Sequence, residues 1–213
     1  ESAKVLANLG LQLQMDYMSF VKRTISGHED LGEVIICRTG YSGEFGYELL
    51  PSWKSAEKVW EILVTEIAKI DGRVCALGAR DTLRTEMGYP LHGHELSLEI
   101  TPVQASASWA VVFSKESFRG KAALVAEKAN GPKQILCAIK CEDRGIPRAG
   151  MFVLSTKGEQ IGLVTSGTFS PTLKIGIGLA LLKPEAKVGD SVSYTAPNGK
   201  TISVQIKHAE YYS

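Results

Sequence analysis

The best candidate for chemistry is a glycine-rich loop that leads into a short strand. Residues 38–48 read R-T-G-Y-S-G-E-F-G-Y-E, so the segment ends in the carboxylate of Glu48. A strand period of two places Tyr47 and Leu49 on one face and Glu48 on the other. A carboxylate between apolar neighbours is costly to bury unless it is paired. Glu48 is therefore either a ligand-binding group or one half of a structural ion pair.

A second charged cluster occupies residues 80–86, which read R-D-T-L-R-T-E. If this segment is helical, Arg80 and Arg84 lie one turn apart on the same face. The pair could belong to a site, or it could be a solvated helix face with local ion pairs. Spacing alone favours the solvated face.

A metal site receives only weak support. His92 and His94 form an H-x-H pair with Glu95 and Glu99 nearby. A metal centre needs a third and fourth ligand in the right geometry, and polar loop residues are the better interpretation. No metal is expected.

The cysteines are better explained as core residues than as metal ligands or members of a disulfide framework. Cys137 and Cys141 lie four residues apart on one strand face, where small core hydrophobes are expected. Together with Cys37 and Cys75 they form no C-x-x-C pair. Reduced thiols in a bacterial cytoplasm or a mitochondrial matrix are expected.

Composition narrows the possible partners. The 213 residues include 24 Lys and Arg and 23 Asp and Glu, a net charge of +1. This balance lacks the basic footprint of a general nucleic-acid binder or a membrane anchor. The sequence contains no apolar run of the roughly 18 residues that span a bilayer. Neither a nucleic acid nor a membrane is expected as a partner.

Hydrophobic periodicity predicts a mixed first part of the chain. Helices are expected at residues 2–9, 53–70, 77–87 and 121–129, and strands at 20–25, 33–38 and 47–50. Residues 101–112 are expected to form a helix that turns into a strand. Ser52 is placed to cap the second helix. The second helix should bury Ala56, Val59, Trp60, Leu63, Ile67 and Ile70, and the third should bury Ala79, Leu83 and Met87.

The sequence pattern changes after the fourth expected helix, from helical periodicity to short strands. Six short strand candidates follow, separated by Gly, Pro, Asn and Asp turns, at residues 135–140, 151–154, 160–166, 175–181, 191–194 and 201–206. Their regular spacing predicts a small all-β barrel or sandwich. The expected class is α+β, with a partial α/β domain at 1–120, a linking helix end and turn at 121–132, and a C-terminal β-barrel at 133–213.

Four motifs resemble those of one enzyme family. Residues 38–48 resemble the R-T-G-Y-[ST]-G-E-x-G-[FY]-E motif of the glycine cleavage system T-protein, the aminomethyltransferase. Residues 78–95 are similar to its G-A-R-D-x-L-R-x-E-x-G-x-x-L-x-G segment. Residues 148–150 and 164–171 resemble its R-A-G and V-T-S-G-x-x-S-P motifs. The motifs occur in the family's order and cover nearly the whole chain.

The resemblance implies a folate enzyme. Family members take an aminomethyl group from the lipoyl arm of the H-protein, release ammonia and pass the one-carbon unit to tetrahydrofolate. The family fold is three domains around a central folate channel. It would make the first part of this chain a partial folate-binding domain and the all-β part the C-terminal barrel.

The resemblance also assigns binding residues. The pterin-facing glutamate of the family falls on Glu48, whose carboxylate can accept two parallel N–H bonds. The folate-contacting arginine falls on Arg80, and a C-terminal tyrosine contact falls on Tyr211. Supporting rather than ligand-contacting roles are expected for Glu44, Arg84 and Arg148.

One departure from the family concerns catalysis. Family chains carry a large N-terminal portion, with the catalytic aspartate, that these 213 residues lack. The start at Glu1 rather than Met also favours a segment of a longer polypeptide. No catalytic residue is therefore assigned, Asp81 is not promoted to that role, and the isolated chain is expected to be inactive.

Three other interpretations stay open. One is a non-catalytic folate-binding relative involved in iron–sulfur cluster maintenance, although residues 118–123 lack the cysteine of its K-G-C-x-x-G-Q-E motif. Another is the folate half of a sarcosine or dimethylglycine dehydrogenase. The last is a β-barrel interaction module, against which the motifs around Glu48 and Arg80 argue.

Overall fold

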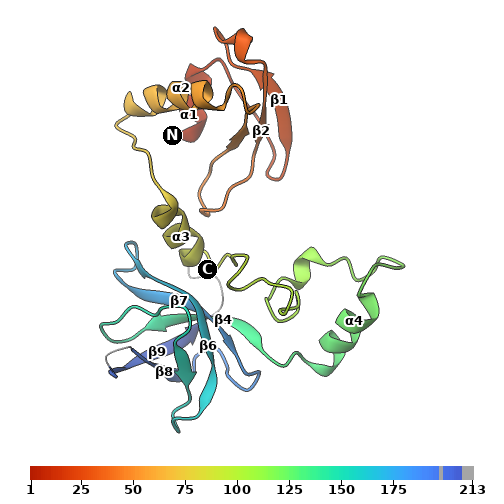
Figure 1. Ribbon diagram of the computed structural model, residues 1–213, viewed down its shortest axis with the longest axis vertical. Helices are drawn as coiled ribbons and strands as arrows, with labels where there is room; N and C mark the ends of the chain where they lie inside the picture. Colours follow the sequence, from red (N-terminus) through yellow and green to blue (C-terminus); the bar gives the residue numbers. More distant parts are fainter. Residues whose placement is uncertain (197–198, 208–213) are drawn as a thin grey trace. The chain divides into compact units, whose positions relative to one another are not determined.

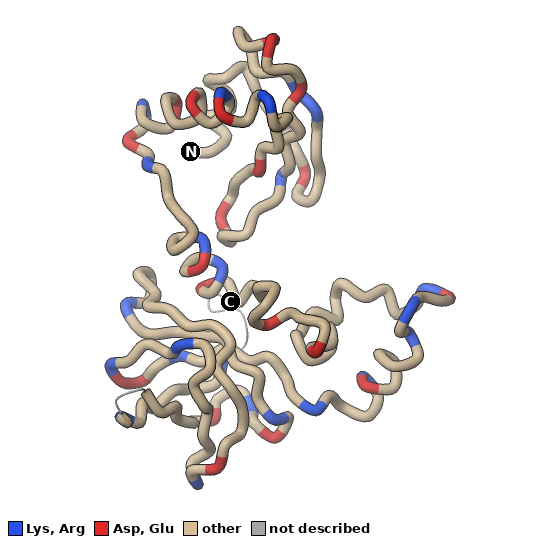
Figure 2. The backbone as a smooth tube through the Cα atoms, in the orientation of Figure 1, with Lys and Arg blue, Asp and Glu red and all other residues tan. Residues whose placement is uncertain are grey.

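The computed structural model describes residues 1–196 and 199–207, which form two compact units, the first made of residues 1–80 and the second of the described residues from 81 onward (Figure 1). Lys and Arg are interspersed with Asp and Glu along both units (Figure 2), so charges of both signs are spread along each of them. Among the described residues, the helices are too short or too polar to cross a bilayer. The domain boundaries expected at 120 and 133 stay a prediction.

The first unit is a three-stranded antiparallel sheet packed against two helices. Val5, Leu6 and Leu9 are all buried, as the helix period predicts, and a left-handed Gly10 follows the helix. The elements are α1 (Ser2–Asn8), β1 (Phe20–Thr24), the 3-10 helix η1 (Glu29–Leu31), β2 (Glu33–Cys37), β3 (Glu48–Leu50) and α2 (Ala56–Ala68).

Helix α2 begins later than its sequence pattern predicts. A turn precedes it, in which the Ser55 N–H donates to Ser52 Oγ at 3.3 Å. Ser52 therefore shapes the turn, while Ser55 occupies the N-cap position. The buried positions are Val59 and Ile62, and Trp60 is 56% exposed, so the expectation that Trp60 would be buried was wrong.

The second unit contains a closed barrel of six antiparallel strands, in the order β4-β7-β6-β5-β8-β9. All six strands predicted from turn spacing are present. Its interior packs apolar side chains such as Ile139, Leu182 and Tyr194. The strands are β4 (Ile135–Cys141), β5 (Phe152–Leu154), β6 (Gln160–Ser170), β7 (Ile175–Leu182), β8 (Ser191–Thr195) and β9 (Thr201–Lys207).

The expectation for residues 101–112 was wrong, because only η2 (Ser108–Ala110) is regular there. Ser106 adopts a positive φ of 55°, which interrupts a helix. The polar groups of this segment bond to β4 instead: the Leu136 N–H donates to the Gln104 carbonyl at 2.8 Å, and Ser106 Oγ donates to the Leu136 carbonyl at 3.2 Å. Helix α4 (Lys121–Asn130) forms as predicted.

Helix α3 (Leu77–Glu86) forms where predicted, but its buried face is different. Leu83 is 37% exposed, whereas Arg84, Thr85 and Glu86 are buried. The expected apolar inward face was wrong because this end of the helix packs on polar residues of β6, described below.

The barrel depends on close backbone approaches at glycines. A Cβ built on Gly167 of β6 would collide with the carbonyl group of Pro147. We expect Gly167→Ala to lower the free energy of unfolding by about 1–3 kcal/mol, because overpacking forces the backbone to shift. Gly40→Ala is the control, since a Cβ there meets nothing within 4 Å. Urea denaturation followed by circular dichroism measures both, and equal midpoints would contradict this account of the barrel.

Candidate functional site

Glu48 lies at the start of β3, opposite Cys37 of β2. Tyr47 and Leu49 pack against the core of the first unit, whereas Glu48 is exposed, as the strand period predicts. Thr39 Oγ1 donates a hydrogen bond to Glu48 Oε2. Since the side chain is exposed and Thr39 holds only one oxygen, the carboxylate keeps capacity to accept further N–H donors.

Arg38 fixes the loop that precedes Glu48. Its guanidinium lies 3.7 Å from the Phe45 ring centroid, and 5.7 and 5.9 Å from those of Tyr17 and Tyr47. Its Nη1 also donates to the Gly46 carbonyl at 3.3 Å. Cation–π contacts of this kind hold a guanidinium against aromatic faces. Arg38 therefore acts as an internal support of the loop.

Arg80 is exposed, and its guanidinium lies 4.6 Å from the ring centroid of Tyr41. Tyr41 belongs to the same loop as Thr39, so Glu48 and Arg80 both contact that loop. Among the described residues the two do not form an ion pair with each other. An exposed carboxylate and a stacked guanidinium can together recognise a flat, N–H-bearing heterocycle that carries a carbonyl or anionic group.

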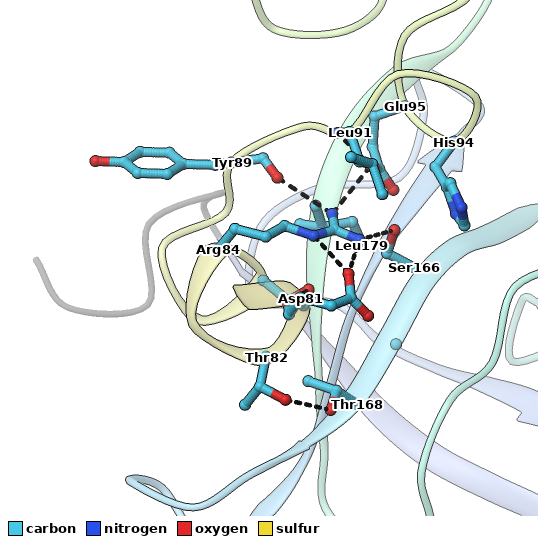
Figure 3. Close-up of polar contacts among 12 residues, drawn as sticks. Asp81, Thr82, Arg84, Tyr89, Leu91, His94, Glu95, Ser166, Thr168 and Leu179 are labelled. Carbon is cyan, nitrogen blue, oxygen red and sulfur yellow. Dashed lines mark hydrogen bonds and ion pairs between the residues drawn. The ribbon is translucent and has the colours of Figure 1, made fainter. Parts of the chain in front are cut away.

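Arg84 is the centre of a buried polar cluster in the second unit (Figure 3). It is 1% exposed, and all five of its N–H hydrogens have acceptors. Nε and Nη2 donate to Asp81 Oδ1 at 2.8 and 2.6 Å, and Nη2 also donates to Ser166 Oγ at 2.8 Å. Nη1 donates to the Tyr89 carbonyl and to Glu95 Oε2, at 3.2 and 3.1 Å.

Glu95 is completely buried, and its Oε2 also accepts the Leu91 N–H at 2.9 Å. Among the described residues, Oε1 has no hydrogen-bond partner. The nearby His94 donates from Nδ1 to the Thr165 carbonyl at 2.8 Å. Two members of the H-x-H region are thus engaged in holding this loop against β6.

Two further contacts join α3 to β6. The hydroxyl groups of Thr82 and Thr168 hydrogen-bond at 3.2 Å (Figure 3), and Ser170 Oγ donates to Glu86 Oε1. Sequence reasoning missed these partners, because they lie more than 80 residues apart along the chain. The available signal was the period-two spacing of Ser166, Thr168 and Ser170 on one strand.

The R-A-G and V-T-S-G-x-x-S-P motifs also meet in the second unit. Arg148 Nη1 donates to the Gly167 carbonyl at 3.0 Å, and the Gly150 N–H donates to the Val164 carbonyl at 2.8 Å. Gly150 has a φ of +86°, which favours glycine. These two motifs and the second half of α3 therefore form one contact region around β6.

Two observations concern the extent of the candidate site around Glu48 and Arg80. Tyr211 lies outside the described residues. A hollow of about 790 Å³ on the barrel is lined by residues that include His94, Lys133 and Lys183, and neither Glu48 nor Arg80 lines it.

Comparisons with known families match both parts of the chain. Residues 1–115, just over half of the chain, match the GCVT N-terminal domain. Residues 134–212 match the glycine cleavage T-protein C-terminal barrel domain.

Named relatives agree with these matches. The aminomethyltransferase of Mycobacterium tuberculosis is 49% identical over 96% of this chain and 55% of its own length. That of Parafrankia sp. is 52% identical over 89% of this chain and 51% of its own length. The chain therefore spans about half the length of the curated relatives it matches.

A solved structure gives the same answer for the fold. The crystal structure of glycine cleavage system aminomethyltransferase T from Bartonella henselae superposes with a TM-score of 0.87 at 30% identity. The match covers 98% of this chain and 56% of that one. These matches confirm the resemblance carried by the four motifs. The chain belongs to the glycine cleavage T-protein family.

Proposed function

We propose that the protein containing this chain transfers the one-carbon unit of an aminomethyl-lipoyl group on the H-protein to tetrahydrofolate, with release of ammonia. The observation that carries the proposal is the exposed Glu48 carboxylate, held at one oxygen by Thr39, on a loop that Arg80 also contacts. The relatives named aminomethyltransferase support this reaction over the dehydrogenase and non-catalytic alternatives.

The residues present fit a pterin. Its amino-pyrimidine edge carries neighbouring N–H donors, and an ionised carboxylate is the group that accepts two such bonds in parallel. Arg80 supplies a delocalised cation that can pair with the anionic or carbonyl groups of folate. Tetrahydrofolate would supply the nitrogen atoms that accept the one-carbon unit, and Glu48 and Arg80 would bind and orient it.

The proposed roles of this chain are binding and positioning. No residue in it is assigned as the catalytic acid or base, and Tyr211 stays a proposed third folate contact. The lipoylated H-protein is the proposed protein partner. A bacterial cytoplasm or mitochondrial matrix is the proposed compartment.

Glu48→Gln in the full-length protein should weaken tetrahydrofolate binding by roughly ten- to a hundred-fold. The substitution keeps the shape of the side chain but replaces an acceptor oxygen with a donor and removes a charge-assisted pair, a loss of about 1.5–3 kcal/mol. Isothermal titration measures the change. Glu44→Gln is the control, because Glu44 is an exposed loop carboxylate. Equal losses in both variants would make Glu48 a structural residue instead.

Thr39→Val should weaken tetrahydrofolate binding about three- to ten-fold, because it removes the hydroxyl that holds Glu48 Oε2 while keeping the branched shape. Thr39→Ser restores the hydroxyl and should recover most of the affinity. If the serine variant binds as poorly as the valine variant, packing at this position matters and the hydrogen bond does not.

The isolated 213-residue chain should show no aminomethyl transfer, since it offers no candidate for the catalytic aspartate. A glycine cleavage assay with the other components supplied would measure the rate. Turnover within an order of magnitude of the full-length protein would place the catalytic group inside this chain.

A further inference from the structure

We propose that Ser166 and Ser170 of β6, with their partners Arg84 and Glu86, are positioning residues that hold α3 so that Arg80 is presented to the ligand. This inference rests on the proposed folate-binding role of Arg80. It assigns a function in binding to serines of the V-T-S-G-x-x-S-P motif that would not touch the ligand themselves.

The first half of α3 has no buried side chain, although Arg80 stacks on the ring of Tyr41. Leu77, at its start, is 80% exposed, and Arg80 is exposed as well. The helix has only ten residues, and helices of that length are marginal in water without tertiary contacts. The course of α3 must therefore be set where its side chains are buried, at Arg84, Thr85 and Glu86.

Arg84 fixes the helix with directional bonds. The five N–H groups of a guanidinium lie in one rigid plane, and here all of them are used. Their acceptors come from α3 itself at Asp81, from the following segment at Tyr89 and Glu95, and from β6 at Ser166. A helix that rotated or shifted would leave a buried cation with unmet donors, which is strongly unfavourable.

Glu86 provides the second anchor. It is 3% exposed, and its carboxylate accepts from Ser170 Oγ and from both the N–H and the hydroxyl of Thr172, the last two at 3.4 and 3.3 Å. Its partners lie four residues beyond Ser166 on the same strand and in the turn that follows. Two anchors at different points along β6 fix the direction of the helix as well as its location.

The strand is adapted to receive these side chains. The β6–β7 register shifts between Val164 and Ser166, so Thr165 is an extra residue. Val164 packs in the barrel core, and beyond the bulge Ser166 and Ser170 share one face and are 3% and 0% exposed. The bulge thus allows the strand to offer two buried hydroxyl groups to α3.

Arg80 lies four residues, about 6 Å along the helix axis, before Arg84 on the same face. Because the helix backbone is stiff over a single turn, a change at Arg84 changes where the Arg80 guanidinium points. The two serines should therefore influence binding only through Arg80.

The first experiment needs no ligand. In the full-length protein, hydrogen exchange of the amides of residues 81–86 should become at least about ten-fold faster in the Ser166→Ala/Ser170→Ala double variant, because two anchoring bonds are lost. The barrel strands should keep their protection. Ser193→Ala, on β8, is the matched control and should leave α3 unchanged. Unchanged exchange in the double variant would overturn the proposal.

The second experiment measures tetrahydrofolate affinity by titration. The double variant should bind about five- to ten-fold more weakly than the wild type. In an Arg80→Gln background the same two substitutions should have no further effect, because the residue through which they act is gone. An undiminished effect in that background would show that the serines act by another route and would overturn the proposal.

The two experiments separate this inference from the proposed function. If the wild-type protein fails to bind tetrahydrofolate, the proposed function fails, and with it the role assigned to the serines in binding. Hydrogen exchange tests the anchoring of α3 independently of folate binding. Faster exchange in the double variant would identify the serines as anchors of the helix even then, and unchanged exchange would rule that out.

Discussion

The buried guanidinium of Arg84 is the interaction on which the second unit depends. A cation that is 1% exposed is tolerated only if its donors are all satisfied, and removing one partner of such a buried pair costs about 3–5 kcal/mol. Its acceptors come from α3, from the segment that follows the helix and from strand β6. Those three segments must therefore assemble together, and they bring the helix motif at residues 78–95 against the V-T-S-G-x-x-S-P motif.

The barrel supplies the rigid side of this assembly. Its six strands close on themselves and pack an apolar interior, so β6 keeps a fixed course beneath α3. Polar groups on that strand are then fixed acceptors and donors. In the first unit the same principle applies on a smaller scale, because Arg38 is held by three aromatic rings and in turn shapes the loop before Glu48.

Local patterns predicted the elements well and the polar contacts poorly. The period of two placed Glu48 opposite Tyr47 and Leu49, because those residues are neighbours in the chain and share one sheet. The six barrel strands could be predicted from the turn residues between them, because those signals are also local in the sequence. The buried face of α3 could not be found this way, since part of the hydrogen bonding that makes it favourable to bury Arg84 and Glu86 comes from β6 and the turn after it, far along the chain. The prediction of a helix and strand at residues 101–112 was wrong for a similar reason, because this segment forms hydrogen bonds to β4, which a local pattern does not reveal.

The extra residue at Thr165 decides which residues of β6 face α3. Val164 and Ser166 lie opposite neighbouring residues of β7, so two steps along β6 match a single step of β7. Removing Thr165 itself would therefore leave Ser166 and every later side chain of β6 on its present face, whereas removing a residue between Ser166 and Ser170 would carry Ser170 to the opposite face. In homologous chains, a change of length should be accepted more readily at the bulge than in the stretch of β6 that follows it.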